Sequence, residues 1–188
     1  MKKKKRLRKL PANKMNKKPV SPTIRYQEHL QDYMDVIDEC FKAEDVSLYR
    51  WIHDPLEDDD FKPQVFQENN PLSVEQLMVP DVDTPKEVKL EYISNFCLSH
   101  FTTEKSAELE YLKAFEKRSK NKSEDRYRKI KENFIRKKGE YIQKINYTVD
   151  SALIGPDNNN HRDVLLMEDC NPQELIDKDY KPKRIDLK

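Results

Sequence analysis

The four histidines and one embedded arginine are the side chains of this sequence best suited to chemistry. The histidines are His29, His53, His100 and His161. Their spacing matches no zinc-binding pattern and the cysteines do not complete one, so we expect no metal site. His100 and His161 are candidate general acids or bases, because an unperturbed imidazole titrates near physiological pH. The alternative for each is an ordinary core or surface histidine.

Arg50 lies inside an apolar stretch, residues 46–53, that has the composition of a short strand and stops at Asp54-Pro55. An arginine in a half-buried strand requires a partner. Four acidic residues follow at positions 57–60. Clustered carboxylates can hold a hard cation, but these lack the alternating ligands and the central glycine of an EF-hand loop. We therefore expect a solvated acidic loop, which could also pair with a basic segment.

Three short segments resemble ADP-ribosyltransferase-like folds. They are Tyr49-Arg50 on a first strand, residues 99–103 running into a helix, and a late acidic residue, Glu168. In that family a first-strand arginine or histidine binds NAD, a Ser/Thr segment follows a second strand, and a glutamate supports ribosyl transfer. The resemblance implies that Arg50 binds the NAD pyrophosphate and that Glu168 stands beside an oxocarbenium ion. The enzyme hypothesis, NAD-consuming or hydrolytic, draws on five residues: Arg50, His100, Thr102, His161 and Glu168.

Several large enzyme classes are excluded by missing motifs. The sequence contains no P-loop, no glycine-rich dinucleotide fingerprint, no H-E-x-x-H and no nucleophile elbow. With only two glycines in 188 residues, a fold that cradles phosphate on a glycine-rich loop is not expected. Outside the NAD-consuming alternative, we expect no cofactor.

Basic side chains crowd the beginning of the chain. Residues 1–18 contain ten Lys or Arg and no acid, so the remainder has a formal charge of −9 although the whole chain has +1. We expect residues 1–23 to form a disordered arm, because like charges repel and three prolines oppose a helix. Such an arm can neutralise nucleic-acid phosphates, act as a nuclear import signal, lie on its own acidic body, or only aid solubility. The candidate nucleic-acid-binding residues are Lys2, Lys3, Lys4, Lys5, Arg6, Arg8, Lys9, Lys14, Lys17 and Lys18.

Between residues 24 and 101 the sequence predicts two helices and the strand at 46–53, with a long loop between them. Residues 24–43 place an apolar stripe on one helical face, formed by Tyr26, Leu30, Tyr33, Ile37 and Phe41. Residues 61–83 are typical of a loop, with one helical turn near 73–78. Thr84-Pro85 predicts a helix start, with Thr84 as the cap and Val88 on the buried face. Residues 96–101 fit a strand as well as a helix.

Residues 103–168 carry the clearest periodicity. Thr103 is expected to cap a helix, a break falls near Asn121, and Gly139 ends a second helix. Residues 141–149 then alternate with period two, and residues 164–167 are apolar after a loop at 155–160. We expect these two runs to form a β-hairpin, followed by a short helix at 172–178 that Asn171 caps.

These patterns predict an α+β fold, with several helices packed on a small, mainly antiparallel sheet. We expect one domain at residues 24–180, between the basic arm and a frayed end at residues 181–188. Three widely separated cysteines indicate reduced thiols in a cytoplasmic protein, or a nuclear one if the source is eukaryotic. No apolar run is long enough to span a membrane, and no secretory signal is expected.

A basic arm on an acidic body, without catalytic signatures, favours a non-enzymatic binding or accessory protein. Its partner would be another protein, or nucleic acid held through the arm. The small enzyme described above is the first alternative. A toxin or immunity partner, whose acidic body blocks a basic surface, is the second.

Overall fold

The computed structural model describes residues 23–67, 74–81 and 83–187. The expected basic arm lies outside these ranges, apart from Thr23, so its conformation stays a prediction. Within the described residues, helices pack on one antiparallel sheet of six strands in the order β4-β5-β2-β1-β3-β6. The predicted α+β class is therefore confirmed.

The strands come from both halves of the chain. They are β1 (Val46–Ile52), β2 (Leu98–Phe101), β3 (Tyr141–Tyr147), β4 (Ala152–Ile154), β5 (His161–Leu166) and β6 (Lys183–Arg184). β1 and β3 pair along their whole length, from Val46 opposite Tyr147 to Ile52 opposite Tyr141. β1 occupies the predicted strand at residues 46–53, and β2 decides the ambiguous residues 96–101 in favour of a strand.

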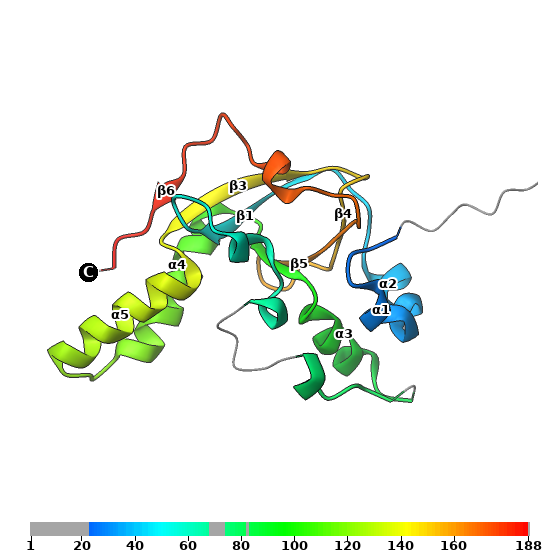
Figure 1. Ribbon diagram of the computed structural model, residues 1–188, viewed down its shortest axis with the longest axis horizontal. Coiled ribbons are helices and arrows are strands. Elements are labelled where there is room, and N and C mark those ends of the chain that lie inside the picture. The colour runs from blue at the N-terminus through cyan, green and yellow to red at the C-terminus, as the bar shows by residue number, and fades with distance from the viewer. Residues whose placement is uncertain (1–22, 68–73, 82, 188) are drawn as a thin grey trace, which may run out of the picture.

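One face of the sheet carries all the longer helices, in two groups. Figure 1 shows α4 (Glu104–Ser119) and α5 (Glu124–Lys138) at the left, and α1 (Gln27–Leu30), α2 (Met34–Cys40) and α3 (Lys86–Ser94) at the right. Trp51, Phe101 and Ile142 of the sheet pack against α4 and α5. Leu165 of β5 packs against the other group. Register places Phe101 opposite His161, so Phe101 and Leu165 lie on the same face of the sheet.

The opposite face is covered by loops instead of helices. Leu48, Leu98, Ile145 and Val164 form its core with Phe61, which belongs to a 3-10 turn. A second 3-10 turn, Pro172–Leu175, replaces the expected helix at 172–178, and Asn171 caps it as predicted by accepting from the Gln173 N–H at 3.2 Å.

The helix expected over residues 24–43 is broken. A 3-10 turn, Gln31–Tyr33, separates α1 from α2, and Tyr26 has a positive φ of 64° before α1 begins. Leu30, Tyr33 and Ile37 are buried nonetheless. The apolar spacing thus identified the core residues, but tertiary packing of short segments prevailed over one continuous helix.

The start of α3 and its buried face also differ from expectation. Pro85, not Thr84, occupies the capping position, and no side chain accepts a cap hydrogen bond there. Val88 is exposed, whereas Tyr92 and Ile93 are buried. The buried face is therefore rotated away from Val88.

The α4–α5 hairpin follows the prediction closely. Thr103 Oγ1 accepts from the Ser106 N–H at 3.0 Å, and α4 buries Ala107, Tyr111 and Phe115. Asn121 has a positive φ of 60°, at the break between the helices. Ser123 precedes α5 without a side-chain cap hydrogen bond. Gly139 ends α5.

The predicted hairpin between residues 141–149 and 164–167 is wrong. β3 pairs with β1 and β6, and β5 pairs with β2 and β4. The hairpin around the loop at 155–160 joins β5 to β4, a strand that no sequence pattern predicted. β3 instead takes an inner position in the sheet, where Ile142, Ile145 and Tyr147 are all buried.

The C-terminal segment packs against the rest of the fold as far as residue 187, contrary to the frayed end expected at residues 181–188. β6 pairs with β3, and Ile185 and Leu187 are buried. Lys183 Nζ lies 2.9 Å from Glu104 Oε1 and 2.8 Å from Glu108 Oε2, and the Tyr180 hydroxyl donates to Glu104 Oε2 at 2.9 Å. These contacts therefore hold the C-terminal segment, residues 180–187, against α4.

Candidate functional site

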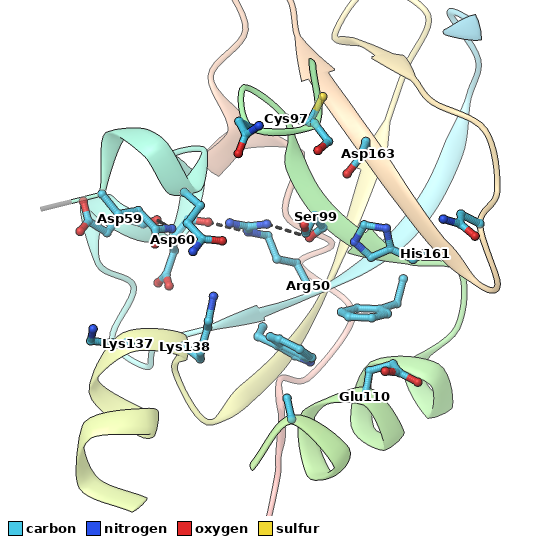
Figure 2. A pocket seen from close by; sticks show the side chains of 18 of the residues that line it. Arg50, Asp59, Asp60, Cys97, Ser99, Glu110, Lys137, Lys138, His161 and Asp163 are labelled. Carbon is cyan, nitrogen blue, oxygen red and sulfur yellow. Dashed lines mark hydrogen bonds between the residues drawn. The ribbon is translucent and has the colours of Figure 1, made fainter. Parts of the chain in front are cut away.

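A broad cleft lies on the helical face of the sheet, between α3 and the α4–α5 hairpin. Its volume is about 1580 Å³. β2 and β5 form the floor, and the loop after β1 closes one side (Figure 2). Sites for small molecules usually enclose roughly 300–1,000 Å³. The larger size suits an extended ligand.

Arg50 lies where β1 and β2 separate. The two strands share one register pair, Tyr49 opposite Phe101. Beyond that pair, the Arg50 guanidinium connects β1 to β2 and to the loop after β1. Its Nη1 donates to the Ser99 carbonyl at 2.7 Å, and its Nε donates to the Asp60 carbonyl at 2.6 Å (Figure 2). Two backbone carbonyls therefore supply the partner that a half-buried arginine requires. Burial lowers the pKa of Arg50, but a guanidinium remains charged.

The Asp60 carboxylate is engaged by its own loop. Oδ1 lies 2.7 Å from His53 Nδ1, and Oδ2 accepts from the backbone N–H groups of His53 and Glu57 at 3.0 and 2.9 Å. Asp60 is 4% exposed, so the expected solvated acidic loop is wrong at this residue. The hydrogen bond to Asp60 raises the pKa of His53, which favours its protonated form.

Lys138 brings a second cation to the cleft from the end of α5. Its side chain points into the cleft in Figure 2. Burial lowers its pKa, and the charges of Arg50, Arg118 and Lys137 lower it further. Lys138 and Arg50 form no ion pair with a carboxylate among residues 23–67, 74–81 and 83–187.

His161 and Asp163 project from β5 into the same cleft. Asp163 is the register partner of Ser99 on β2. Burial raises the pKa of Asp163, while the charge of His161 opposes that shift. An imidazole and a carboxyl group of raised pKa can exchange protons with a ligand. The Cys97 thiol also lines the cleft, but burial raises its pKa well above the usual 9.0, so little reactive thiolate forms.

The five residues of the enzyme hypothesis do not meet in one place. Arg50 and His161 line the cleft, whereas His100, Thr102 and Glu168 are not among its lining residues. Thr102 Oγ1 donates to Asn160 Oδ1 at 3.2 Å, and Glu168 is an exposed residue whose N–H donates to the Thr23 carbonyl at 3.0 Å. The resemblance to ADP-ribosyltransferase-like folds therefore lacks its glutamate in the cleft.

His100 is enclosed in the core on the far side of β2. Its Nδ1–H donates to the Leu98 carbonyl at 3.1 Å, which leaves Nε2 to accept from the Tyr147 hydroxyl at 2.8 Å. Burial lowers the pKa of His100 well below 6.5, and the charge of Arg50 adds to this effect. The imidazole is neutral and shielded from solvent, as in the core-histidine alternative.

A basic surface lies next to the cleft, on the α4–α5 hairpin. Residues 117–138 contain eleven Lys or Arg and three acidic residues, a formal charge of +8. The rest of residues 23–188 contains fifteen Lys or Arg against thirty-two acids, a formal charge of −17. Six exposed cations on the hairpin form neither an ion pair nor a side-chain hydrogen bond within the described part of the chain, whereas Arg118 and Arg136 bond to Ala114 and Asn133. These six exposed cations are Lys117, Lys120, Lys122, Arg126, Arg128 and Lys129.

Sequence reasoning missed Asp60, Asp163 and Lys138 as cleft residues, and it included Ser99 only within the segment 99–103 of the resemblance. The alternation of His161 and Asp163 in one strand was a usable signal, because residues two apart share a face. Lys138 lies in the last turn of α5, where any cation suits the helix dipole, so its position alone does not indicate a site. Nothing local connects Asp60 or Ser99 with Arg50.

Neither a metal-ligand cluster nor a helix able to span a membrane occurs among the described residues. No group of three or more His, Cys, Asp or Glu side chains is placed to hold a metal ion there. No helix in those same ranges is long and apolar enough to cross a membrane. No family model matches the chain, and no curated protein or solved structure shows significant similarity to it.

Proposed function

We propose that this chain is a non-enzymatic nucleic-acid-binding protein, and that the α4–α5 hairpin supplies an ordered binding surface. The six exposed cations carry the proposal. They gather on one element while the remainder of the body is acidic, so the surrounding charge orients a polyanion toward the hairpin. The ten cations of residues 1–18 add to this attraction under the same hypothesis.

The hairpin offers contacts to phosphates rather than to bases. Lys and Arg side chains bind the phosphate backbone without reading sequence. Tyr127, the aromatic residue nearest the outer end of α5, is half-buried and packs edge-on against Phe115, with ring centroids 5.4 Å apart. It is not free to stack on a base. We therefore expect affinity that depends little on sequence and strongly on salt.

Binding of a fluorescent duplex at several salt concentrations tests the proposal. The test variant is Lys120→Ala/Lys122→Ala/Arg126→Ala, which removes three exposed cations without touching the core. We expect the slope of log affinity against log salt to become shallower by roughly two to three, because each phosphate contact contributes about 0.9.

A matched control separates this site from general charge. Lys42→Ala/Lys178→Ala/Lys181→Ala removes three exposed lysines outside residues 117–138 and should leave the slope almost unchanged. Equal losses in both triple variants would contradict the hairpin surface, as would absent binding of the full chain at about 50 mM salt. Deleting residues 2–18 measures the contribution of the arm separately.

An enzyme remains the second candidate because Arg50, His161 and Asp163 share the cleft. A cation beside an imidazole and a carboxyl group of raised pKa can support hydrolysis or group transfer at a phosphorylated or NAD-like substrate. His161→Ala and Asp163→Asn should abolish any nucleotide or NAD turnover by the full chain. Turnover that survives both substitutions would remove this candidate.

A further inference from the structure

We propose that Arg50 and Lys138 form an anion-binding subsite in the cleft, which holds a phosphate group of the bound nucleic acid. The inference deepens the proposed function and rests on it for the natural ligand. The subsite itself is separate from the six exposed cations, because it lies in the cleft at the inner end of α5.

Arg50 is oriented before any ligand arrives. Its Nε and Nη1 are held by the carbonyls of Asp60 and Ser99, on opposite sides of the guanidinium (Figure 2). Nη2 has no hydrogen-bond partner within the described residues, and it is not among the buried polar atoms left unsatisfied there. This N–H₂ group can therefore donate to a ligand without breaking an existing bond.

Lys138 supplies the second charge from a different element. Its ammonium group has no hydrogen bond or ion pair within residues 23–67, 74–81 and 83–187. Arg50 and Lys138 are close enough for the charge of Arg50 to lower the pKa of Lys138. Two cations that repel each other in a half-buried place cost free energy, and an anion between them would relieve that cost.

No carboxylate of the cleft forms an ion pair with either cation within the described residues, although the charge of Asp60 opposes the lowering of the Arg50 pKa by burial. Asp60 is bonded to His53 through Oδ1, at 2.7 Å. Glu110 pairs with Lys113 at 2.7 Å on the exposed side of α4. Asp163 lies on β5 near the Cys97 thiol, whose pKa its charge raises, and burial raises the pKa of Asp163 itself. None of the three forms an ion pair with Arg50 or Lys138.

A phosphate group matches these donors better than a carboxylate does. It carries several acceptor oxygens and can bind an arginine fork and an ammonium group together. α5 runs from the outer end of the hairpin back to the sheet (Figure 1), and its last residue, Lys138, lines the cleft. A strand lying along the hairpin can therefore place one phosphate in the cleft, whose volume of about 1580 Å³ admits a chain.

The first experiment uses the unmodified full chain and inorganic pyrophosphate. Lysines are labelled briefly with an amine-reactive acylating reagent, and each site is quantified by peptide mass spectrometry. Pyrophosphate should protect Lys138 at least about threefold and leave Lys113 and Lys42 unprotected, because a bound anion favours the unreactive ammonium form. Lack of protection of Lys138 up to roughly 10 mM pyrophosphate, far above the Kd of a useful site, would overturn the subsite.

The second experiment compares Lys138→Gln with Lys113→Gln. Both remove one cleft lysine, but only Lys113 has an ion-pair partner. Lys138→Gln should weaken pyrophosphate binding roughly tenfold or more, and Lys113→Gln should not, because only the first variant removes a charge-assisted hydrogen bond to the anion. Arg50 is left intact, since its loss would orphan two carbonyls. Equal affinities of the two variants would overturn the subsite.

The source of the phosphate is decided by two further ligands, a single-stranded oligonucleotide and free NAD. Weaker oligonucleotide binding by Lys138→Gln supports a nucleic-acid phosphate in the cleft. If only NAD binding depends on Lys138, the ligand is a free nucleotide and the nucleic-acid assignment is overturned. The Lys120/Lys122/Arg126 variant should keep its pyrophosphate affinity, so a failure of the hairpin surface and a failure of the subsite give different results.

Discussion

His53 and His100 have partners that move their pKa values in opposite directions. His53 bonds to the Asp60 carboxylate, which raises its pKa, and the stability from this pair is lost as pH rises through that raised value. His100 is enclosed with the Tyr147 hydroxyl, and burial lowers its pKa well below 6.5. The same residue type therefore partners a carboxylate at the cleft wall, which favours its protonated form, and serves as a neutral acceptor in the core.

Replacement of His100 should destabilise the fold in a pH-dependent manner. In the folded protein His100 stays neutral, whereas in the unfolded chain it takes up a proton near pH 6.5. Its contribution is therefore full above pH 6.5 and falls as pH decreases toward the lowered folded-state pKa. We expect His100→Ala to cost roughly 2–4 kcal/mol at pH 7.5, from a cavity and an unpaired Tyr147 hydroxyl.

Urea unfolding at pH 7.5 and 5.5 measures this effect. The difference in free energy of unfolding between the natural chain and His100→Ala should be smaller at pH 5.5. An identical difference at both pH values would show that His100 does not change protonation on unfolding. His29→Ala serves as a control, because His29 is not enclosed in the core.

At the scale of elements, the joint between α5 and β3 depends on the backbone of Gly139. Its φ of 70° and ψ of 176° fall in a region that only glycine adopts readily. A Cβ atom at this position would lie 1.9 Å from the Ile52 carbonyl oxygen of β1. The Gly139 carbonyl also accepts from the Tyr111 hydroxyl at 2.6 Å. Gly139 is therefore the residue at which the end of α5, Tyr111 of α4 and strand β1 come into contact.

Gly139→Ala should lower the free energy of unfolding by roughly 3 kcal/mol or more, from backbone strain and the clash with β1. Gly139→Asn should be no milder. Asparagine tolerates the ordinary left-handed helical region, but not a positive φ combined with ψ near 180°. Thermal or urea unfolding measures both variants. An asparagine variant close to the natural stability would show that the position needs only a common helix-ending conformation.

At the scale of the whole molecule, opposite charges are separated and the C-terminal segment closes the structure. The basic α4–α5 hairpin projects beside a body of net negative charge. The segment that follows the 3-10 turn Pro172–Leu175 returns to α4, where Lys183 forms ion pairs with Glu104 and Glu108. It ends with Ile185 and Leu187 buried among α4, α5 and β3. The segment thereby holds the basic hairpin against the sheet.

Ile185→Ala should destabilise the protein by roughly 2–4 kcal/mol, because a large side chain is lost from a closed core. Asp186→Ala, at the exposed residue between the two buried ones, should change stability by less than about 0.5 kcal/mol. Chemical unfolding compares the two. A neutral Ile185→Ala would show that the terminal segment does not dock in solution.

The fold class and the boundaries of β1, α4 and α5 followed from local signals. Thr103 begins α4, the break at Asn121 separates the helices, and Gly139 ends α5, because caps and helix ends depend on residues within a few positions of each other. Val46–Ile52 was identified as a strand from its own composition. The apolar stripe at Leu30, Tyr33 and Ile37 identified core positions even though the helix that carries them is broken.

Only the tertiary structure decided which strands pair and which side chains share the cleft. β3 pairs with β1 and not with the expected partner at residues 164–167, and this pairing links residues about a hundred positions apart. Arg50 donates to the Ser99 carbonyl, and its charge lowers the pKa of Lys138, because β2 and the end of α5 converge on β1. No spacing rule connects such distant residues. Their encounter depends on how apolar faces from the whole chain are buried together, and that is settled only when the chain folds.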